Sequence, residues 1–111
     1  MKNRSSLGQF ELMVLLAVMR ISDDAYGVPI AREIENISGR GVARGSVYFA
    51  LERLEAKGLV SSALGEPTAA RGGRAKRYFH VTARGVREVR DTRRTLTRLW
   101  EGLPQLEGLG V

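Results

Sequence analysis

The sequence contains no cysteine, which excludes both a disulfide framework and a thiolate metal site. Its one histidine, His80, has no Cys or His partners for a metal and no nucleophile at the spacing of a catalytic triad. The longest apolar run, Leu12–Met19, is too short to cross a bilayer. We therefore expect no metal, no cofactor and no membrane insertion.

The N-terminus is basic and precedes that apolar run, as in a secretory signal peptide. However, Glu11 lies at the start of the run, Arg20 ends it, and no small-residue cleavage site follows. We expect no signal peptide, and the absence of cysteine fits a protein of the reducing cytoplasm.

Acidic residues are scarce in the second half of the chain. From Arg71 to Arg98 there are ten basic residues and only two acidic ones, Glu88 and Asp91. This window carries a charge of +8 and the remaining residues carry −2, within a formal net charge of +6. A localised positive field favours a polyanionic partner, although a basic face that is merely solvated remains the alternative.

A chain of 111 residues predicts one domain, and its first half reads as three helices. Helical apolar spacing predicts them over residues 8–21, 26–37 and 44–58. The first helix is apolar nearly all round, and a small domain cannot easily cover both of its faces. Burial against a second subunit is the simplest solution.

The second half predicts two strands, over 59–64 and 75–81, joined by a basic, glycine-rich loop. In the second strand, Phe79 and Val81 are expected to face one way, and Tyr78 and His80 the other. A last helix starts near Thr82, a candidate N-cap, and extends to about Gly102 with apolar residues at near-heptad spacing. The expected fold is mainly α with a small two-stranded antiparallel wing. It comprises a winged helix-turn-helix DNA-binding domain over 1–82, a dimerisation helix over 83–103 and a disordered tail over 104–111.

This arrangement suits double-stranded DNA, because the major groove admits one α-helix and a basic wing can neutralise phosphates. Several stretches then resemble the PadR family of bacterial repressors. They are LGQFEL at 7–12, AYGVPI at 25–30, GSVYFALERLE at 45–55, KGLV at 57–60, GGRAKRYF at 72–79 and VTARG at 81–85. The resemblance covers about residues 7–103, and the order and spacing of the motifs make it specific.

The resemblance implies a homodimeric cytoplasmic repressor whose third helix reads DNA and whose hairpin contacts the backbone. The implied recognition-helix contacts are Arg44, Ser46, Tyr48, Phe49 and Arg53. The implied wing contacts are Arg71, Gly72, Gly73, Arg74, Lys76 and Arg77. Many relatives have proline where this chain has Phe49 and a serine-like cap where it has Ala43, so the base preference does not carry over.

In shorter members of the family the last helix swaps onto the partner's first helix. The dimer contacts expected here are Phe10, Leu12, Leu15, Leu16, Met19, Val89, Leu96, Leu99, Trp100 and Leu103. The family also holds flat aromatic effectors between subunits, where Trp100 could stack on the ligand or serve only in packing.

Other interpretations stay open for some residues and for the whole chain. Tyr48 could cover the edge of the core, and Arg77 could be held inside the hairpin. The arginines of the last helix are expected to be mostly solvated or ion-paired. The main functional alternative is a winged-helix module that binds protein. An enzyme is disfavoured by the lack of a phosphate-binding Gly-Lys-Ser/Thr loop, and RNA by the lack of an aromatic-rich sheet.

Overall fold

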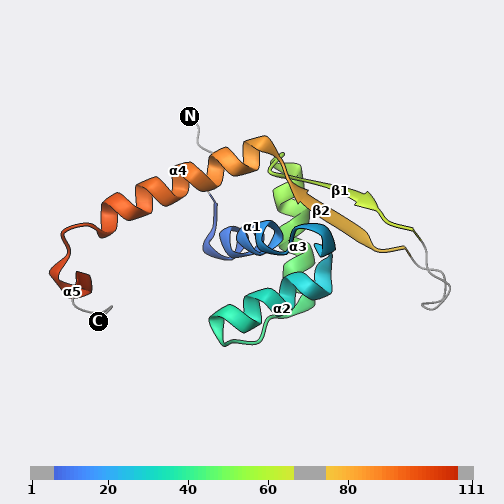
Figure 1. Cartoon of the computed structure of the whole chain (residues 1–111), viewed down its shortest axis with the longest axis horizontal. Coiled ribbons are helices and arrows are strands. Elements are labelled where there is room, and N and C mark those ends of the chain that lie inside the picture. Colours follow the sequence, from blue (N-terminus) through green and yellow to red (C-terminus); the bar gives the residue numbers. More distant parts are fainter. Residues whose placement is uncertain (1–6, 67–74, 108–111) are drawn as a thin grey trace.

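The computed structural model describes residues 7–66 and 75–107 of the chain. Three short helices form a bundle, a two-stranded hairpin extends from one side, and a long helix reaches away on the other (Figure 1). No helix within the described ranges has both the length and the apolar character needed to cross a bilayer. The elements are α1 (Gln9–Ile21), η1 (Ser22–Asp24), α2 (Gly27–Ser38), α3 (Arg44–Ala56), β1 (Val60–Leu64), β2 (Arg77–Val81), α4 (Ala83–Trp100) and α5 (Pro104–Glu107).

The core lies where α1, α2 and α3 meet and is closed by the hairpin. Its apolar side chains come from all three helices, from Ala25 before α2, from Leu59 and Val60 at the start of the hairpin, and from Phe79 on β2. Burying one such large aliphatic side chain contributes roughly 1.5–3 kcal/mol relative to leaving it exposed, so this cluster is the main source of stability. The fully buried members include Val14, Leu15, Ile30, Val47, Leu51 and Leu54.

The strands β1 and β2 pair antiparallel, with Val60 opposite Val81 and Ser62 opposite Phe79. As the alternation predicts, Phe79 points into the core and His80 is exposed. The backbone N–H of Phe79 donates to the carbonyl of Ala25 at 2.8 Å. The hairpin is thereby fixed to the segment that leads into α2.

The N-terminus of α4 is joined tightly to the turn that follows α3. Thr82 is the predicted N-cap: its hydroxyl oxygen accepts from the Gly85 N–H at 3.0 Å. The same hydroxyl donates to the Gly58 carbonyl at 2.8 Å, and the Thr82 N–H donates to the Leu59 carbonyl at 3.0 Å. Gly85 is needed here because a Cβ would overlap the carbonyl oxygen of Leu59.

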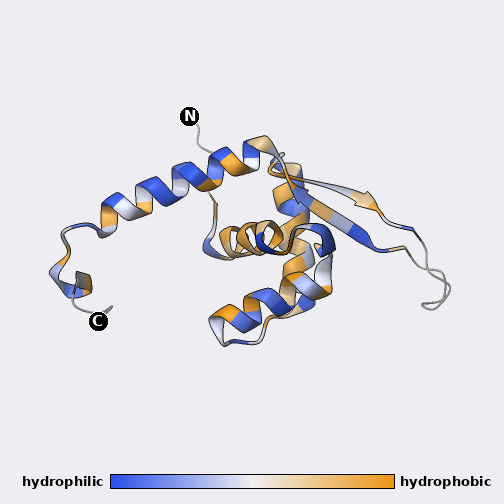
Figure 2. Cartoon of the chain, in the orientation of Figure 1, coloured by the Kyte–Doolittle hydropathy of each residue, from blue (hydrophilic) through white to orange (hydrophobic). Residues whose placement is uncertain are grey.

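Beyond its first turns, α4 leaves the bundle. Val89 still packs against the core, whereas Leu99 and Trp100 are exposed. Figure 2 shows apolar residues recurring along α4 among hydrophilic ones. The radius of gyration is 16.2 Å, compared with about 13 Å for a compact chain of this length. The far end of this amphipathic helix therefore presents exposed apolar side chains.

The segment after α4 differs in part from the expectation of a disordered tail. Residues 104–107 form a single helical turn, α5, which begins at Pro104. Proline suits this place because the first helical residue needs no N–H donor. Residues 108–111 lie outside the described ranges.

Candidate nucleic-acid interface

Helix α3 has one buried face and one open face. Val47, Ala50, Leu51 and Leu54 are buried against α1 and α2. The opposite face exposes residues at i, i+3, i+4 and i+7, the spacing of a single helical stripe. These are Gly45, Tyr48, Phe49 and Glu52. A helix with an unobstructed face of this kind can enter a major groove.

The N-terminus of α3 carries positive potential. Ala43 precedes it in an extended conformation and provides no side-chain cap. The N–H groups at the start of a helix have no partner within the helix, and here no side chain caps them. They give this end a partial positive charge, beside the exposed Arg44 and Ser46. Both residues belong to the predicted recognition-helix contacts, and both lie in the first turn of α3.

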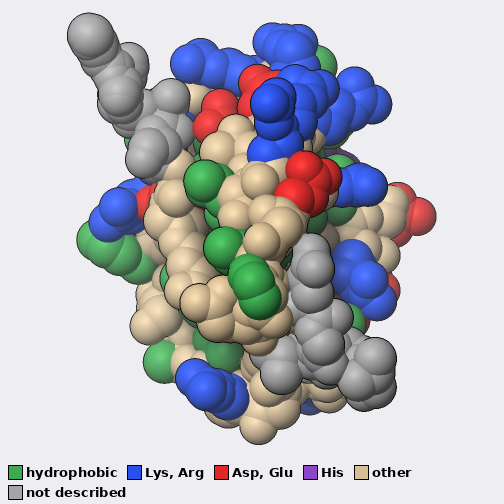
Figure 3. Space-filling model, turned by 90° about the vertical axis from the view of Figure 1, so that its left-hand side faces the viewer, with side chains coloured by type: hydrophobic (Ala, Val, Ile, Leu, Met, Phe, Trp, Pro, Cys, Tyr) green, Lys and Arg blue, Asp and Glu red, His purple; other side chains and the backbone are tan. Residues whose placement is uncertain are grey.

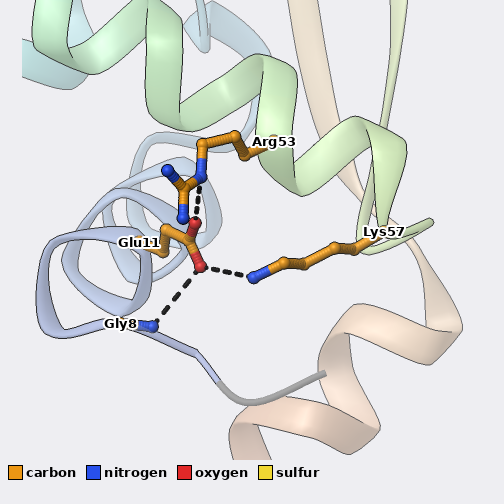
Figure 4. Close-up of polar contacts among 4 residues, drawn as sticks. All are labelled: Gly8, Glu11, Arg53 and Lys57. Atoms are coloured by element: carbon orange, nitrogen blue, oxygen red, sulfur yellow. Dashed lines mark hydrogen bonds and ion pairs between the residues drawn. The ribbon is translucent and has the colours of Figure 1, made fainter. Parts of the chain in front are cut away.

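A buried carboxylate, Glu11, joins α1 to α3 (Figure 4). Only 5% of Glu11 is exposed. Its Oε2 accepts from Arg53 Nε at 2.7 Å, and its Oε1 accepts from Lys57 Nζ at 2.7 Å and from the Gly8 N–H at 3.4 Å. The N-terminus of α1 is thus held against the second half of α3.

Burial by itself raises the pKa of Glu11, because a charged carboxylate loses hydration. The hydrogen bonds and charge of Lys57, together with the Gly8 N–H and Arg53, outweigh this effect. The net pKa of Glu11 lies below its ordinary value of 4.5, so the residue is ionised at neutral pH.

Arg53 is a predicted DNA contact that also has a structural role. Its Nε is occupied by Glu11, and its guanidinium carbon lies 5.5 Å from the centroid of the Phe49 ring. The side chain stays about half exposed. Arg53 therefore reaches the surface with a restricted orientation, between the buried Glu11 and the exposed Phe49.

Tyr48 packs at the edge of the core, as one interpretation of the sequence has it, and its role as a DNA contact stays a prediction. Its ring lies against the backbone of Gly27 at the start of α2, so closely that a Cβ on Gly27 would overlap the ring. The residue is nevertheless exposed on the open face of α3. Gly27 allows α2 and α3 to approach while Tyr48 remains accessible.

Lys76 directly precedes β2, at the loop end of the hairpin, and is held by Tyr26. Its Nζ donates to the hydroxyl of Tyr26 at 3.3 Å and lies 4.5 Å from the centroid of the same ring. Tyr26 in turn meets Tyr78 edge-on, with 5.4 Å between ring centroids. These contacts place the Lys76 ammonium beside the start of α2.

Arg77 lies within the hairpin, as the alternative interpretation of the sequence has it. Its Nη1 donates to the hydroxyl oxygen of Ser62 at 3.0 Å, and that hydroxyl donates to Glu55 Oε2 at 2.8 Å. Arg77 is exposed, so this network leaves part of the guanidinium open to solvent. The other predicted wing contacts lie outside the described residues: Arg71, Gly72, Gly73 and Arg74.

Of the expected dimer contacts, Leu15 needs correction. It is completely buried within its own protomer, because it points into the three-helix core, and cannot contact a partner. The exposed members of the set are Leu16, Met19, Leu99, Trp100 and Leu103. The partly buried members are Phe10, Leu12, Val89 and Leu96.

Sequence reasoning missed the positioning residues Glu11 and Tyr26. Their partners lie 42 to 50 positions away along the chain, beyond the reach of any helical or strand periodicity. A single acid at the start of an apolar helix was the only signal for Glu11. Among the described residues, no group of three His, Cys, Asp or Glu side chains could hold a metal ion.

The sequence matches the model of one protein family. A family model, the transcriptional regulator PadR-like family, matches residues 15–91. Among curated proteins, none matches the chain significantly.

Solved structures share the fold. A PadR family transcriptional regulator from Eggerthella lenta DSM 2243 is 22% identical, with a TM-score of 0.68 over 87% of this chain and 82% of that one. A PadR family regulator from Clostridium difficile R20291 is 21% identical, with a TM-score of 0.69 over 88% of this chain and 97% of the other. The complex structure of hsRosR-S4 is 25% identical, with a TM-score of 0.65 and coverages of 96% and 85%.

Proposed function

Since the chain belongs to the PadR-like family of transcriptional regulators, we propose that it is a repressor that binds a pseudo-palindromic DNA operator as a homodimer. Membership makes the chain a regulator of transcription and not an enzyme. Repression would follow from occupying a promoter, and the two recognition helices would enter successive major grooves about 34 Å apart.

The observation that carries this proposal is the open face of α3 flanked by cations. Arg44 lies at one end of that face, Arg53 lies beside it, and Lys76 lies at the loop end of the hairpin, held against Tyr26. Cations around a reading helix can bind phosphates on both sides of a groove and fix its depth. Base edges then face the exposed side chains of α3.

The unpartnered stripe of α4 supports the homodimer. Leu99 is 66% exposed and Trp100 57% exposed, and Leu103 and Leu106 extend the apolar surface toward the C-terminus. In Figure 3, basic side chains gather at the top of the molecule, where α4 lies in Figure 1, and leave apolar side chains open below them. A groove of about 310 Å³ between α1 and α2 offers a further apolar surface, with Met13, Leu16, Ile34 and Ile37 in its lining. A second copy is the simplest cover for these surfaces.

Release by a small aromatic effector belongs to the same proposal. Trp100 is the only tryptophan of the chain, and its exposed ring lies on the apolar side of α4. In a dimer built through α4 this ring can stack on a flat ligand. An effector bound there would act by favouring a subunit arrangement in which the reading helices no longer match the operator.

Selection of bound fragments from a random duplex library tests DNA binding and half-site spacing together. We expect an enriched site with two inverted half-sites whose centres lie about 10 base pairs apart. Electrophoretic mobility on random duplex at low salt is the simpler companion measurement. If the protein retains no duplex in dilute buffer and enriches no sequence, the α3 face is not a DNA-reading surface, and a protein-binding module becomes the better account.

A further inference from the structure

The open α3 face ends at an acid with no counter-charge. Glu52 is exposed, and no hydrogen bond or ion pair joins it to another residue in the part of the chain that the structure describes. Glu55, one turn along, is different because its Oε2 accepts from Ser62 at 2.8 Å. The helical neighbours of Glu52 at i±3 and i±4 are Tyr48, Phe49, Glu55 and Ala56, and none of them is cationic.

A free carboxylate at this place weakens binding to any polyanion, because phosphates repel it. It can favour a particular sequence only by accepting hydrogen bonds from a base edge. The donors in the major groove are the amino groups of cytosine N4 and adenine N6. Adenine places its N7 acceptor beside the amino group, which repels a carboxylate, whereas cytosine presents the amino group without an adjacent acceptor on the same base.

Phe49 supplies the apolar counterpart on the same stripe. Its ring is 60% exposed and lies three residues before Glu52, a helical rise of about 4.5 Å. Successive base pairs are about 3.4 Å apart along the duplex. An exposed aromatic ring in the major groove fits the thymine methyl group. The two side chains can thus face neighbouring or next-neighbouring base pairs.

We infer that Glu52 and Phe49 are specificity-determining residues, reading a cytosine N4 amino group and a thymine methyl group within two base pairs of each other in each half-site. This rests on the proposed function, since it assigns base edges to the α3 face. Glu52 supplies discrimination at the expense of affinity. Arg44 and Lys76, at the edges of the interface, supply affinity without reading sequence.

The test repeats the library selection with the wild type, Glu52→Gln, Phe49→Ala and the control Glu101→Gln. Glu101 is an exposed acid at the end of α4, away from α3. For the wild type we expect a C·G preference of roughly 5- to 100-fold at one position of the half-site, within two base pairs of a T·A. In Glu52→Gln we expect that preference to move toward A·T, because an amide pairs bidentately with adenine.

The same charge removal should strengthen binding of Glu52→Gln to random duplex by about two- to fivefold at low salt. Phe49→Ala should lose the T preference and keep the C preference, and Glu101→Gln should match the wild type throughout. An unchanged consensus in Glu52→Gln, or a wild-type site without neighbouring T and C, overturns the inference while leaving DNA binding intact. Failure of the wild type to retain any duplex overturns the proposed function instead. Circular dichroism verifies that each exposed-site variant is folded.

Discussion

A single carboxylate, Glu11, holds the start of α1 against α3, so Glu11→Gln tests how far one side chain stabilises the reading helix. The variant keeps the shape but loses the charge that binds Arg53 and Lys57. We expect a loss of about 1.5–3 kcal/mol in the free energy of unfolding, the range for hydrogen bonds to charged groups. Denaturant unfolding at pH 7 measures it. Asp91→Asn is the matched control, because its ion pair with Arg94 is exposed and should contribute little.

The difference in unfolding free energy between the wild type and Glu11→Gln should also depend on pH. The folded-state pKa of Glu11 is lowered, so its stabilising contribution is fully present above the unfolded value near 4.5 and is lost as pH falls through the lower folded value. The stability gap between wild type and Glu11→Gln should therefore stay constant above about pH 5.5 and narrow below about pH 4.5. A gap that widens in acid would contradict the assigned network.

At the hairpin, Lys76→Ala and Arg74→Ala should each weaken binding to every duplex and lower the slope of log affinity against log salt by about 0.9 for each phosphate that is no longer neutralised. Tyr26 fixes the Lys76 ammonium through its hydroxyl and ring, so Tyr26→Leu should have part of the effect of Lys76→Ala. Arg98→Ala, at the exposed far end of α4, is the control. Fluorescence anisotropy across a salt series gives the slopes, and unchanged slopes in both hairpin variants would remove the wing from the interface.

Residue types and spacing predicted which surface of α3 is open, but not how each side chain is used. Tyr48 is exposed as predicted, yet its contact with Gly27 depends on the crossing of two helices. Leu15 lies in the core and not on the expected dimer surface, because an all-apolar helix gives no periodic signal to separate its faces. The partial commitment of Arg53 to Glu11 depends on a pairing over 42 positions that local patterns cannot reveal.

Replacing either of two helical glycines with alanine should change the stability of the protein, but in opposite directions. Gly85→Ala places a Cβ against the Leu59 carbonyl, so α4 must shift, and we expect a loss of about 1–3 kcal/mol despite the better helix propensity of alanine. Gly45→Ala meets nothing within 4 Å and should raise the free energy of unfolding by about 0.4–1 kcal/mol. Thermal and denaturant unfolding of the two variants measure whether each free energy of unfolding rises or falls. Equal effects would show that α4 is not seated on the Leu59 backbone.

The longer helices and the strands were predictable, because each has a regular spacing of apolar residues and a residue type that marks where it begins or ends. Helix α4 begins at the predicted cap Thr82, and β2 alternates as expected between the buried Phe79 and the exposed His80. The helix α5 was not predictable, since four residues are too few to show a period. The direction in which α4 leaves the bundle was equally hidden, because it is set by the hydrogen bonds around Gly58 and Leu59.

If the protein is a dimer joined through α4, a charge in the apolar stripe of that helix should halve its mass in solution. Leu99→Asp places a charge in the apolar stripe of α4 and should convert a dimer into a folded monomer with weakened operator binding. Leu64→Asp is the matched control, because Leu64 is 62% exposed against 66% for Leu99 but lies at the end of β1. Sedimentation equilibrium distinguishes the two states. A wild-type monomer at high concentration, or a Leu99→Asp dimer, would contradict the proposed interface.

The corner at Leu59 has a mechanical consequence. The turn after α3 and the start of α4 are joined by the hydrogen bonds of Thr82 and are in close contact at Gly85. The 18 residues of α4 therefore form a lever arm about 27 Å long. In a protein joined to its twin along that arm, a tilt of about 5° displaces the corner by about 2 Å, more than half of the 3.4 Å step between base pairs. In the proposed dimer, a small change of angle between the two α4 helices would therefore move the reading helices out of register with the duplex.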